Sequence, residues 1–96
     1  MYDSKYLLKT INPHFQAVWY KTKKAEIRYT GDRKFEVGRR YRLREFDVAK
    51  GYLDRYVDIE ITHILPFEEF PEGLKPGYAM LSFVEVERGE VATHDT

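Results

Sequence analysis

The sequence predicts an α+β domain that is mostly β: a small pseudo-barrel of about five mainly antiparallel strands, with one N-terminal helix capping it. Residues 12–21 contain apolar side chains at helical spacing, and five other stretches are typical of short strands. The loops between the expected strands are short, which favours antiparallel neighbours. The 96 residues fit one domain. We expect that domain over residues 1–88, followed by a polar C-terminal tail at 89–96.

The helix is expected directly after a first strand over residues 5–10. Asn12 is a typical helix N-cap, and Pro13 suits the first helical position because the N–H that proline lacks has no partner there. The apolar residues that follow have i, i+3, i+4 spacing: Phe15, Val18 and Trp19. We expect the helix to run to about residue 21 and this stripe to belong to the core.

The remaining strands are expected over residues 24–30, 40–46, 55–65 and 78–86. In residues 24–30, one face is apolar (Ala25, Ile27, Tyr29) and the other is charged (Lys24, Glu26, Arg28). Residues 55–65 show the clearest alternation, and His63 shares the parity of its apolar face, so we expect His63 to point inward. Pro66 ends that strand because proline cannot donate to a ladder. The expected core is Phe15, Trp19, Ile27, Leu43, Val57, Ile59, Ile61, Leu81 and Phe83.

Composition narrows the possible functions. The chain has no cysteine and three widely spaced histidines, so neither thiolate chemistry nor a metal site is expected, and no cofactor is expected. No apolar run approaches the roughly 20 residues that span a bilayer. The first residues do not resemble a signal peptide. We therefore expect a cytoplasmic protein with no membrane partner.

The net charge is zero, but the charges are divided unevenly along the chain. Residues 1–50 contain 13 Lys and Arg against 6 Asp and Glu, whereas residues 51–96 contain 3 against 10. Such asymmetry has two interpretations. The basic half binds an anionic partner, or basic and acidic strands pair across the sheet.

The segment richest in candidate functional residues is the K-x-x-E-x-R pattern of Lys23, Glu26 and Arg28. On a strand, Glu26 and Arg28 share a face, so the guanidinium holds the carboxylate ionised and oriented. Lys23 adds a second cation, which makes an anion-binding edge with one acceptor, as a nucleobase or phosphate-bearing ligand requires. The alternative is a solvated charged face with weak surface ion pairs.

Five motifs occur in order along residues 5–86: Leu8-Lys9 through Phe15; Lys21-Thr22-Lys23-Lys24-Ala25-Glu26-Ile27-Arg28; Asp32-Arg33-Lys34-Phe35-Glu36-Val37-Gly38; Leu43-Arg44-Glu45; and Ile64-Leu65-Pro66 with Gly73-Leu74-Lys75-Pro76-Gly77-Tyr78-Ala79-Met80-Leu81-Ser82. In these motifs the sequence resembles the ASCH-like branch of the PUA superfamily, and within it a small domain-of-unknown-function group of bacteria and phages. The sequence departs from the motifs at two positions, with Lys21 in place of a glycine and Arg39 in place of an aspartate.

The resemblance implies a PUA-like, ASCH-like pseudo-barrel with a cleft beside the first helix that binds RNA or a nucleotide-like ligand. The residues that would bind this ligand are Lys9, Lys21, Lys23, Glu26, Arg28, Asp32 and Arg33. Tyr20, Tyr29 and Tyr41 are candidate rings for base stacking. The pI of about 6.8 is lower than that of most strong RNA binders, so we expect modest affinity that falls with salt.

Two other functions remain open. Some compact relatives of similar fold are amidohydrolases that act on acylated cytidine, using a lysine and a threonine three residues later. Here Lys23 matches the lysine but Glu26 occupies the threonine position, so an enzyme would need Glu26 as general base and Lys23 as electrophile. The third function is a bacterial or phage protein-interaction module, in which the acidic segment containing Glu68, Glu69 and Glu72 meets a partner. The sequence leaves the oligomeric state open.

Overall fold

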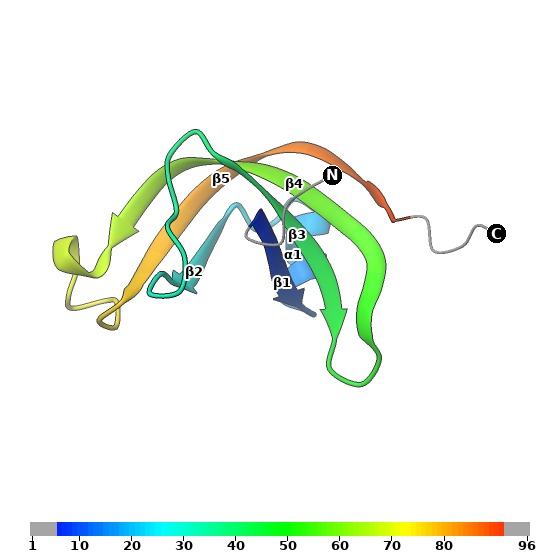
Figure 1. Ribbon diagram of the computed structural model, residues 1–96, viewed down its shortest axis with the longest axis horizontal. Coiled ribbons are helices and arrows are strands. Elements are labelled where there is room, and N and C mark those ends of the chain that lie inside the picture. Colours follow the sequence, from blue (N-terminus) through cyan, green and yellow to red (C-terminus); the bar gives the residue numbers. More distant parts are fainter. Residues whose placement is uncertain (1–5, 92–96) are drawn as a thin grey trace.

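A computed structural model describes residues 6–91, which form one curled, five-stranded sheet with a short helix (Figure 1). The strands are β1 (Leu7–Ile11), β2 (Ala25–Tyr29), β3 (Arg40–Asp47), β4 (Gly51–Pro66) and β5 (Tyr78–Glu90), and the helix is α1 (His14–Trp19). A 3-10 turn, η2 (Phe67–Glu69), follows β4. The mostly β, five-stranded architecture predicted from the sequence is confirmed.

The strand order is β1-β3-β4-β5-β2, so β1 and β2 are the two edges of the sheet. Only β1 and β3 pair in parallel, and the other three neighbouring pairs are antiparallel. The sheet bends into an arch, with β4 and β5 along its top and α1 and β1 beneath it (Figure 1). The result is half a barrel with its edges brought towards each other.

The core fills the concave side of this arch. The buried apolar side chains are Leu8, Phe15, Val18, Phe35, Tyr41, Leu43, Val57, Ile59, Ile61, Ala79, Leu81 and Phe83. Phe15 and Val18 bring α1 into the core, and Trp19 is half-buried against it. The helix begins two residues after Asn12, whose side-chain oxygen accepts a hydrogen bond from the Gln16 N–H at 3.2 Å.

The structure corrects two expected core positions. Ile27 is 59% exposed, because β2 turns its charged face inward. His63 is exposed, because the β4–β5 register shifts between Ile61 and His63. A shift of that kind reverses side-chain parity, so the alternation that correctly buried Ile59 and Ile61 does not continue to His63.

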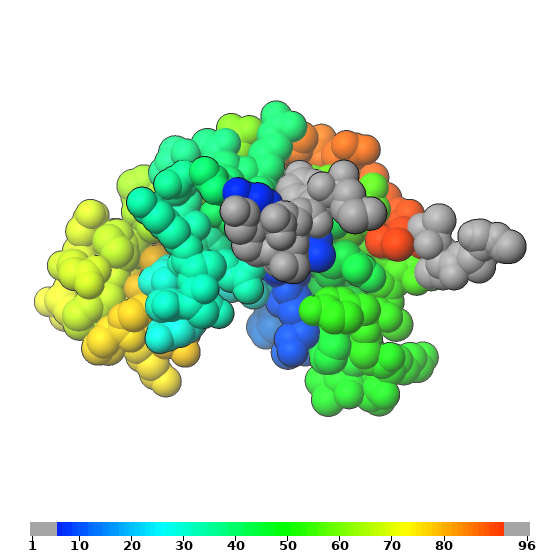
Figure 2. All heavy atoms as spheres, viewed as in Figure 1, coloured from blue at the N-terminus to red at the C-terminus, as the bar shows by residue number. Residues whose placement is uncertain are grey.

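Two strands are longer than their sequence pattern suggested. The segment at Asp47–Gly51 is a tight hairpin, in which the Asp47 carboxylate accepts hydrogen bonds from the Ala49 and Lys50 N–H groups, and β4 begins at Gly51. Strand β5 continues past residue 86 to Glu90, which pairs with Arg55. The polar tail expected at 89–96 therefore begins within a strand, and residues 92–96 lie outside the described part of the chain. In Figure 2 the hairpin stands clear of the body at the lower right.

The uneven charges of the two halves meet across β3 and β4. Arg40 lies 3.2 Å from Glu60, and Arg42 binds Asp58 at 2.7 Å. In the opposite sense, Arg55 of the acidic half binds Glu45 at 2.8 Å. The pairs of Arg40 and Arg42 agree with the second interpretation of the charge asymmetry, in which basic and acidic strands pair across the sheet.

Candidate functional site

The two sheet edges are joined by arginine side chains instead of a backbone ladder. Arg28 of β2 donates from Nη2 to the Lys9 carbonyl at 3.0 Å and to Thr10 Oγ1 at 3.1 Å. Arg33, in the loop after β2, donates to the Leu7 carbonyl at 3.1 Å. Carbonyl groups of an edge strand have no ladder partner on their open side, so guanidinium donors take that place. We refer to this line of contacts between β1 and β2 as the seam.

Along the seam lies a cleft of about 580 Å³. Its lining comes from β1, the start of α1, the turn that precedes β2, β2 itself and Met80 of β5. The polar and aromatic lining residues used below are Thr10, His14, Lys23, Glu26, Arg28 and Tyr29. This volume is within the range of small-ligand sites, roughly 300–1,000 Å³.

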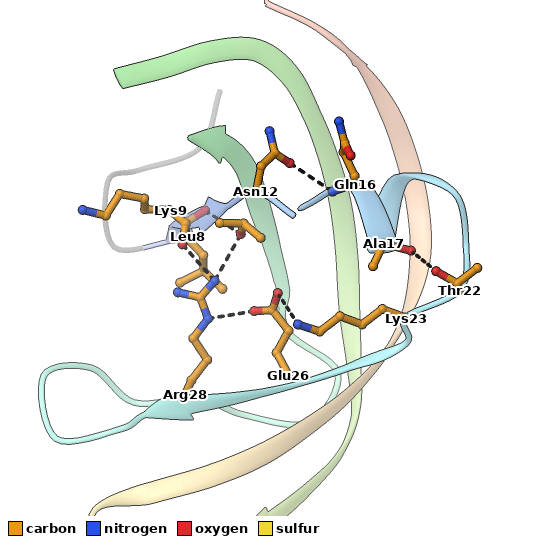
Figure 3. Close-up of polar contacts among 10 residues, drawn as sticks. Leu8, Lys9, Asn12, Gln16, Ala17, Thr22, Lys23, Glu26 and Arg28 are labelled. Atoms are coloured by element: carbon orange, nitrogen blue, oxygen red, sulfur yellow. Dashed lines mark hydrogen bonds and ion pairs between the residues drawn. The ribbon is translucent and has the colours of Figure 1, made fainter. Parts of the chain in front are cut away.

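Glu26 lies at the centre of the polar contacts in this cleft (Figure 3). One carboxylate oxygen accepts a hydrogen bond from Arg28 Nε at 2.9 Å, and the other lies 3.7 Å from Lys23 Nζ. The Glu26 side chain is 7% exposed, whereas those of Arg28 and Lys23 are 22% and 28% exposed. Two cations thus surround one buried carboxylate and leave a net charge of +1 with solvent-accessible donors.

This arrangement explains why β2 turns its charged face inward. At the seam, the concave face of β2 meets the backbone of β1 and not an apolar layer. Arg28 donates hydrogen bonds to Glu26 and to the Lys9 carbonyl of β1. The charged side chains of β2 therefore have protein partners on the concave side of the sheet. Ile27 and Tyr29 consequently face outward, each more than half exposed.

The end of α1 sets the position of Lys23. The Ala17 carbonyl accepts hydrogen bonds from the backbone N–H groups of Thr22 and Lys23 and from the Thr22 hydroxyl. Lys21 lies within this turn with φ of +67°, and it is the one non-glycine residue of 6–91 with positive φ. This left-handed conformation favours glycine, so a lysine at this position is strained.

The structure brings together Lys23, Glu26 and Arg28, as the sequence predicted, but it places Lys21, Asp32 and Arg33 outside this cleft. Lys21 borders a separate hollow of about 240 Å³ with Val18 and Glu85. Asp32 and Arg33 line a third hollow of about 590 Å³, beyond Thr30.

Lys9 touches the cleft, but its side chain points away from Glu26 (Figure 3), and its ammonium lies 4.6 Å from the centre of the Phe46 ring. The residues that the sequence analysis missed are His14 and Thr10. In the sequence, nothing distinguishes Thr10 from other strand residues or His14 from other helix residues. They line the cleft only because β1 approaches β2 in the fold.

The three candidate stacking tyrosines occupy different environments. Tyr41 is buried in the core, and that burial raises the pKa of its hydroxyl, so it is not available for stacking. Tyr29 lines the cleft, is 51% exposed and packs against Tyr78 with ring centres 5.4 Å apart. Tyr20 is 68% exposed but borders none of the three hollows described above.

Within residues 6–91, no three His, Asp or Glu side chains gather as metal ligands would. The helices of that same range are all too short or too polar to cross a membrane.

A comparison with models of protein families matches most of this chain. The family model described as Domain of unknown function (DUF3850) matches residues 6–83, a range that includes every residue lining the cleft. No curated protein matches the chain.

Proposed function

The chain belongs to the family described as Domain of unknown function (DUF3850), and we propose that it binds RNA or a nucleotide-like ligand in the cleft between β1 and β2. The observation that carries this proposal is the excess of cationic donors around Glu26. Lys23 and Arg28 together outweigh the single carboxylate, and both are partly open to solvent. A phosphate group brought into the cleft meets an ammonium and a guanidinium that are already positioned by neighbouring contacts.

Other cleft residues fit the rest of a nucleotide. The Tyr29 ring at the rim offers an aromatic face for a base. The exposed imidazole of His14 supplies a donor and an acceptor suited to a sugar hydroxyl or a base edge, whereas the buried Thr10 hydroxyl is already bonded to Arg28 and to the Leu8 carbonyl. Glu26 has both oxygens next to cations, so its role in this proposal is to orient Arg28.

We also propose that the chain is related to the ASCH-like branch of the PUA superfamily, which it resembles in its motifs. The left-handed backbone of Lys21 supports it, because the motif's glycine would adopt that conformation without strain. The curled, mostly antiparallel sheet with a cleft beside its first helix also agrees with what the resemblance implies.

A hydrolase using Glu26 as general base is a weaker alternative. One Glu26 oxygen accepts a hydrogen bond from Arg28 Nε at 2.9 Å, the other lies 3.7 Å from Lys23 Nζ, and the side chain is only 7% exposed, so a substrate proton has little access to this carboxylate. Incubation with a panel of acylated and unmodified nucleosides tests this alternative. The acidic segment at residues 68–72 is exposed at the far end of the arch from the β3–β4 hairpin, and nothing in its geometry favours a particular partner.

The test uses a labelled oligouridine and fluorescence anisotropy over a range of salt concentrations. We expect Lys23→Ala to weaken binding and to lower the salt slope by about 0.7, as the loss of one contact to a single-stranded phosphate backbone does. Lys24→Ala is the matched control, since Lys24 has the same charge but does not line the cleft. Equal effects of the two substitutions, or no binding by the unaltered protein, would contradict the proposal.

A further inference from the structure

The convex surface of β1, β3 and β4 carries a row in which cations alternate with aromatic rings. The Lys9 ammonium lies 4.6 Å from the centre of the Phe46 ring, and the Phe46 and Tyr52 rings meet edge-on with centres 5.2 Å apart. Beyond Tyr52, the Arg44 guanidinium lies 5.1 Å from its ring centre. We call these four residues the cation–ring strip.

Backbone pairing holds the strip in place. Lys9 pairs with Arg44 across β1 and β3, and Phe46 pairs with Tyr52 across the hairpin of β3 and β4. The Arg44 side chain is further fixed by a hydrogen bond to the Leu53 carbonyl at 3.1 Å. Four side chains from three strands therefore form one continuous surface.

The charges of the strip are unbalanced, unlike those beside it. On the same face of β3, Arg40 and Arg42 are paired with Glu60 and Asp58. Within residues 6–91, neither Lys9 nor Arg44 has a carboxylate within 4 Å. Two uncompensated cations thus flank an aromatic pair.

The Tyr52 ring is also unusually open to solvent. Tyr52 is 55% exposed at the hairpin that stands clear of the body in Figure 2. An exposed ring between unpaired cations matches the chemistry of single-stranded nucleic acid. Bases stack on aromatic faces, and the cations approach the phosphates.

We propose that the cation–ring strip is a second contact surface for single-stranded nucleic acid, on which bases stack against Tyr52 and Phe46. The proposal rests on the proposed function of the cleft and extends it from a nucleotide to an oligonucleotide. Lys9 connects the two surfaces. Its carbonyl accepts the Arg28 hydrogen bond at the seam, while its ammonium extends onto the strip.

Asp54 supplies a contrasting position on the same strand. It is exposed, shares the parity of Tyr52 on β4, and has no ion pair within residues 6–91. Its negative charge repels a phosphate backbone lying on the strip. Asp54→Asn should therefore strengthen oligonucleotide binding, the opposite of the effect expected for Tyr52→Ala.

The test compares a labelled oligouridine of about 12 nucleotides, within the site sizes of single-strand binding modules, with uridine monophosphate. We expect Tyr52→Ala to weaken oligouridine binding about tenfold, because loss of one stacked base has effects of that order. Binding of the mononucleotide should not change. Tyr52→Phe should retain the unaltered affinity, because it keeps the ring. Tyr20→Ala is the matched control for loss of an exposed tyrosine outside the strip and should have no effect.

The outcomes separate this proposal from the function of the cleft. If Lys23→Ala weakens both ligands but Tyr52→Ala weakens neither, the strip is overturned and the cleft stands. The strip is also overturned if oligouridine binds no more tightly than the mononucleotide. If the unaltered protein binds neither probe, both proposals fail. Thermal unfolding of each variant separates loss of contact from loss of fold.

Discussion

Removal of the Arg28 guanidinium should destabilise the fold by about 3 kcal/mol. Arg28 makes three hydrogen bonds, to Glu26, to the Lys9 carbonyl and to Thr10. In Arg28→Ala, Glu26 remains 7% exposed with only Lys23, 3.7 Å away, as a partner. Breaking a buried ion pair on one side costs roughly 3–5 kcal/mol. Because Arg28 is 22% exposed, water can reach Glu26 once the guanidinium is removed, and the expected cost lies at the lower end of this range.

The explanation is tested by making Arg28→Ala in a protein that already carries Glu26→Gln, and comparing its cost with that in the unaltered protein. With the carboxylate already neutral, Arg28→Ala leaves no unpaired charge, and its cost should fall to about 1 kcal/mol. The assay is urea unfolding at pH 7 of the unaltered protein, the two single variants and the double variant. A cost for Arg28→Ala that is below about 1 kcal/mol, or equal in both backgrounds, would refute the argument that the side chain closes the seam through Glu26.

Three further predictions concern the stability of the fold. Lys21→Gly should stabilise the protein by about 1 kcal/mol in urea unfolding, because it removes the cost of a left-handed non-glycine residue; a less stable variant would contradict this. The hydrogen bond from Arg55 lowers the pKa of Glu45, so Glu45 stabilises the fold above its unfolded-state pKa, and this contribution is lost as the pH falls through the lowered value. Glu45→Gln should therefore be less stable at pH 7 and lose less stability between about pH 5 and 3, and parallel pH profiles would exclude this role. Trp19→Ala should cost about 2–3 kcal/mol, less than a fully buried ring, since Trp19 is half-buried beneath the Arg55 and Arg88 guanidinium groups; an unchanged melting temperature would show that these contacts contribute nothing.

Strand periodicity predicted which side chains share a face better than which face is buried. In β2, the alternation correctly separates Glu26 and Arg28 from Ile27. The expectation that the apolar face points inward is wrong, because β2 is an edge strand whose concave side meets the backbone of β1. The Lys9 carbonyl that Arg28 contacts is 19 residues away in sequence, and side chains join the two strands, so no local pattern reveals this neighbour. In β4, a single register shift has the same effect on His63.

The candidate site was predictable where it is local. Lys23, Glu26 and Arg28 lie within six residues, and a turn followed by a strand brings them together. The direction of the Lys9 side chain and the presence of His14 depend on how two distant strands approach each other. The cation–ring strip was not predicted, because its rings come from two strands and a hairpin whose pairing the sequence does not specify.

The inward-facing charges of β2 also bear on self-association. An edge strand offers unpaired backbone groups to any other strand, and a second copy of the same edge is a ready partner. A strand that docked against β2 would have to cover Glu26 and Arg28 and displace the guanidinium from β1. Charged side chains pointing inward on an edge strand oppose that kind of pairing. The residues proposed to attract a ligand therefore also protect the open side of the sheet from aggregation, and apolar substitutions at both positions should convert that edge into a site of polymerisation.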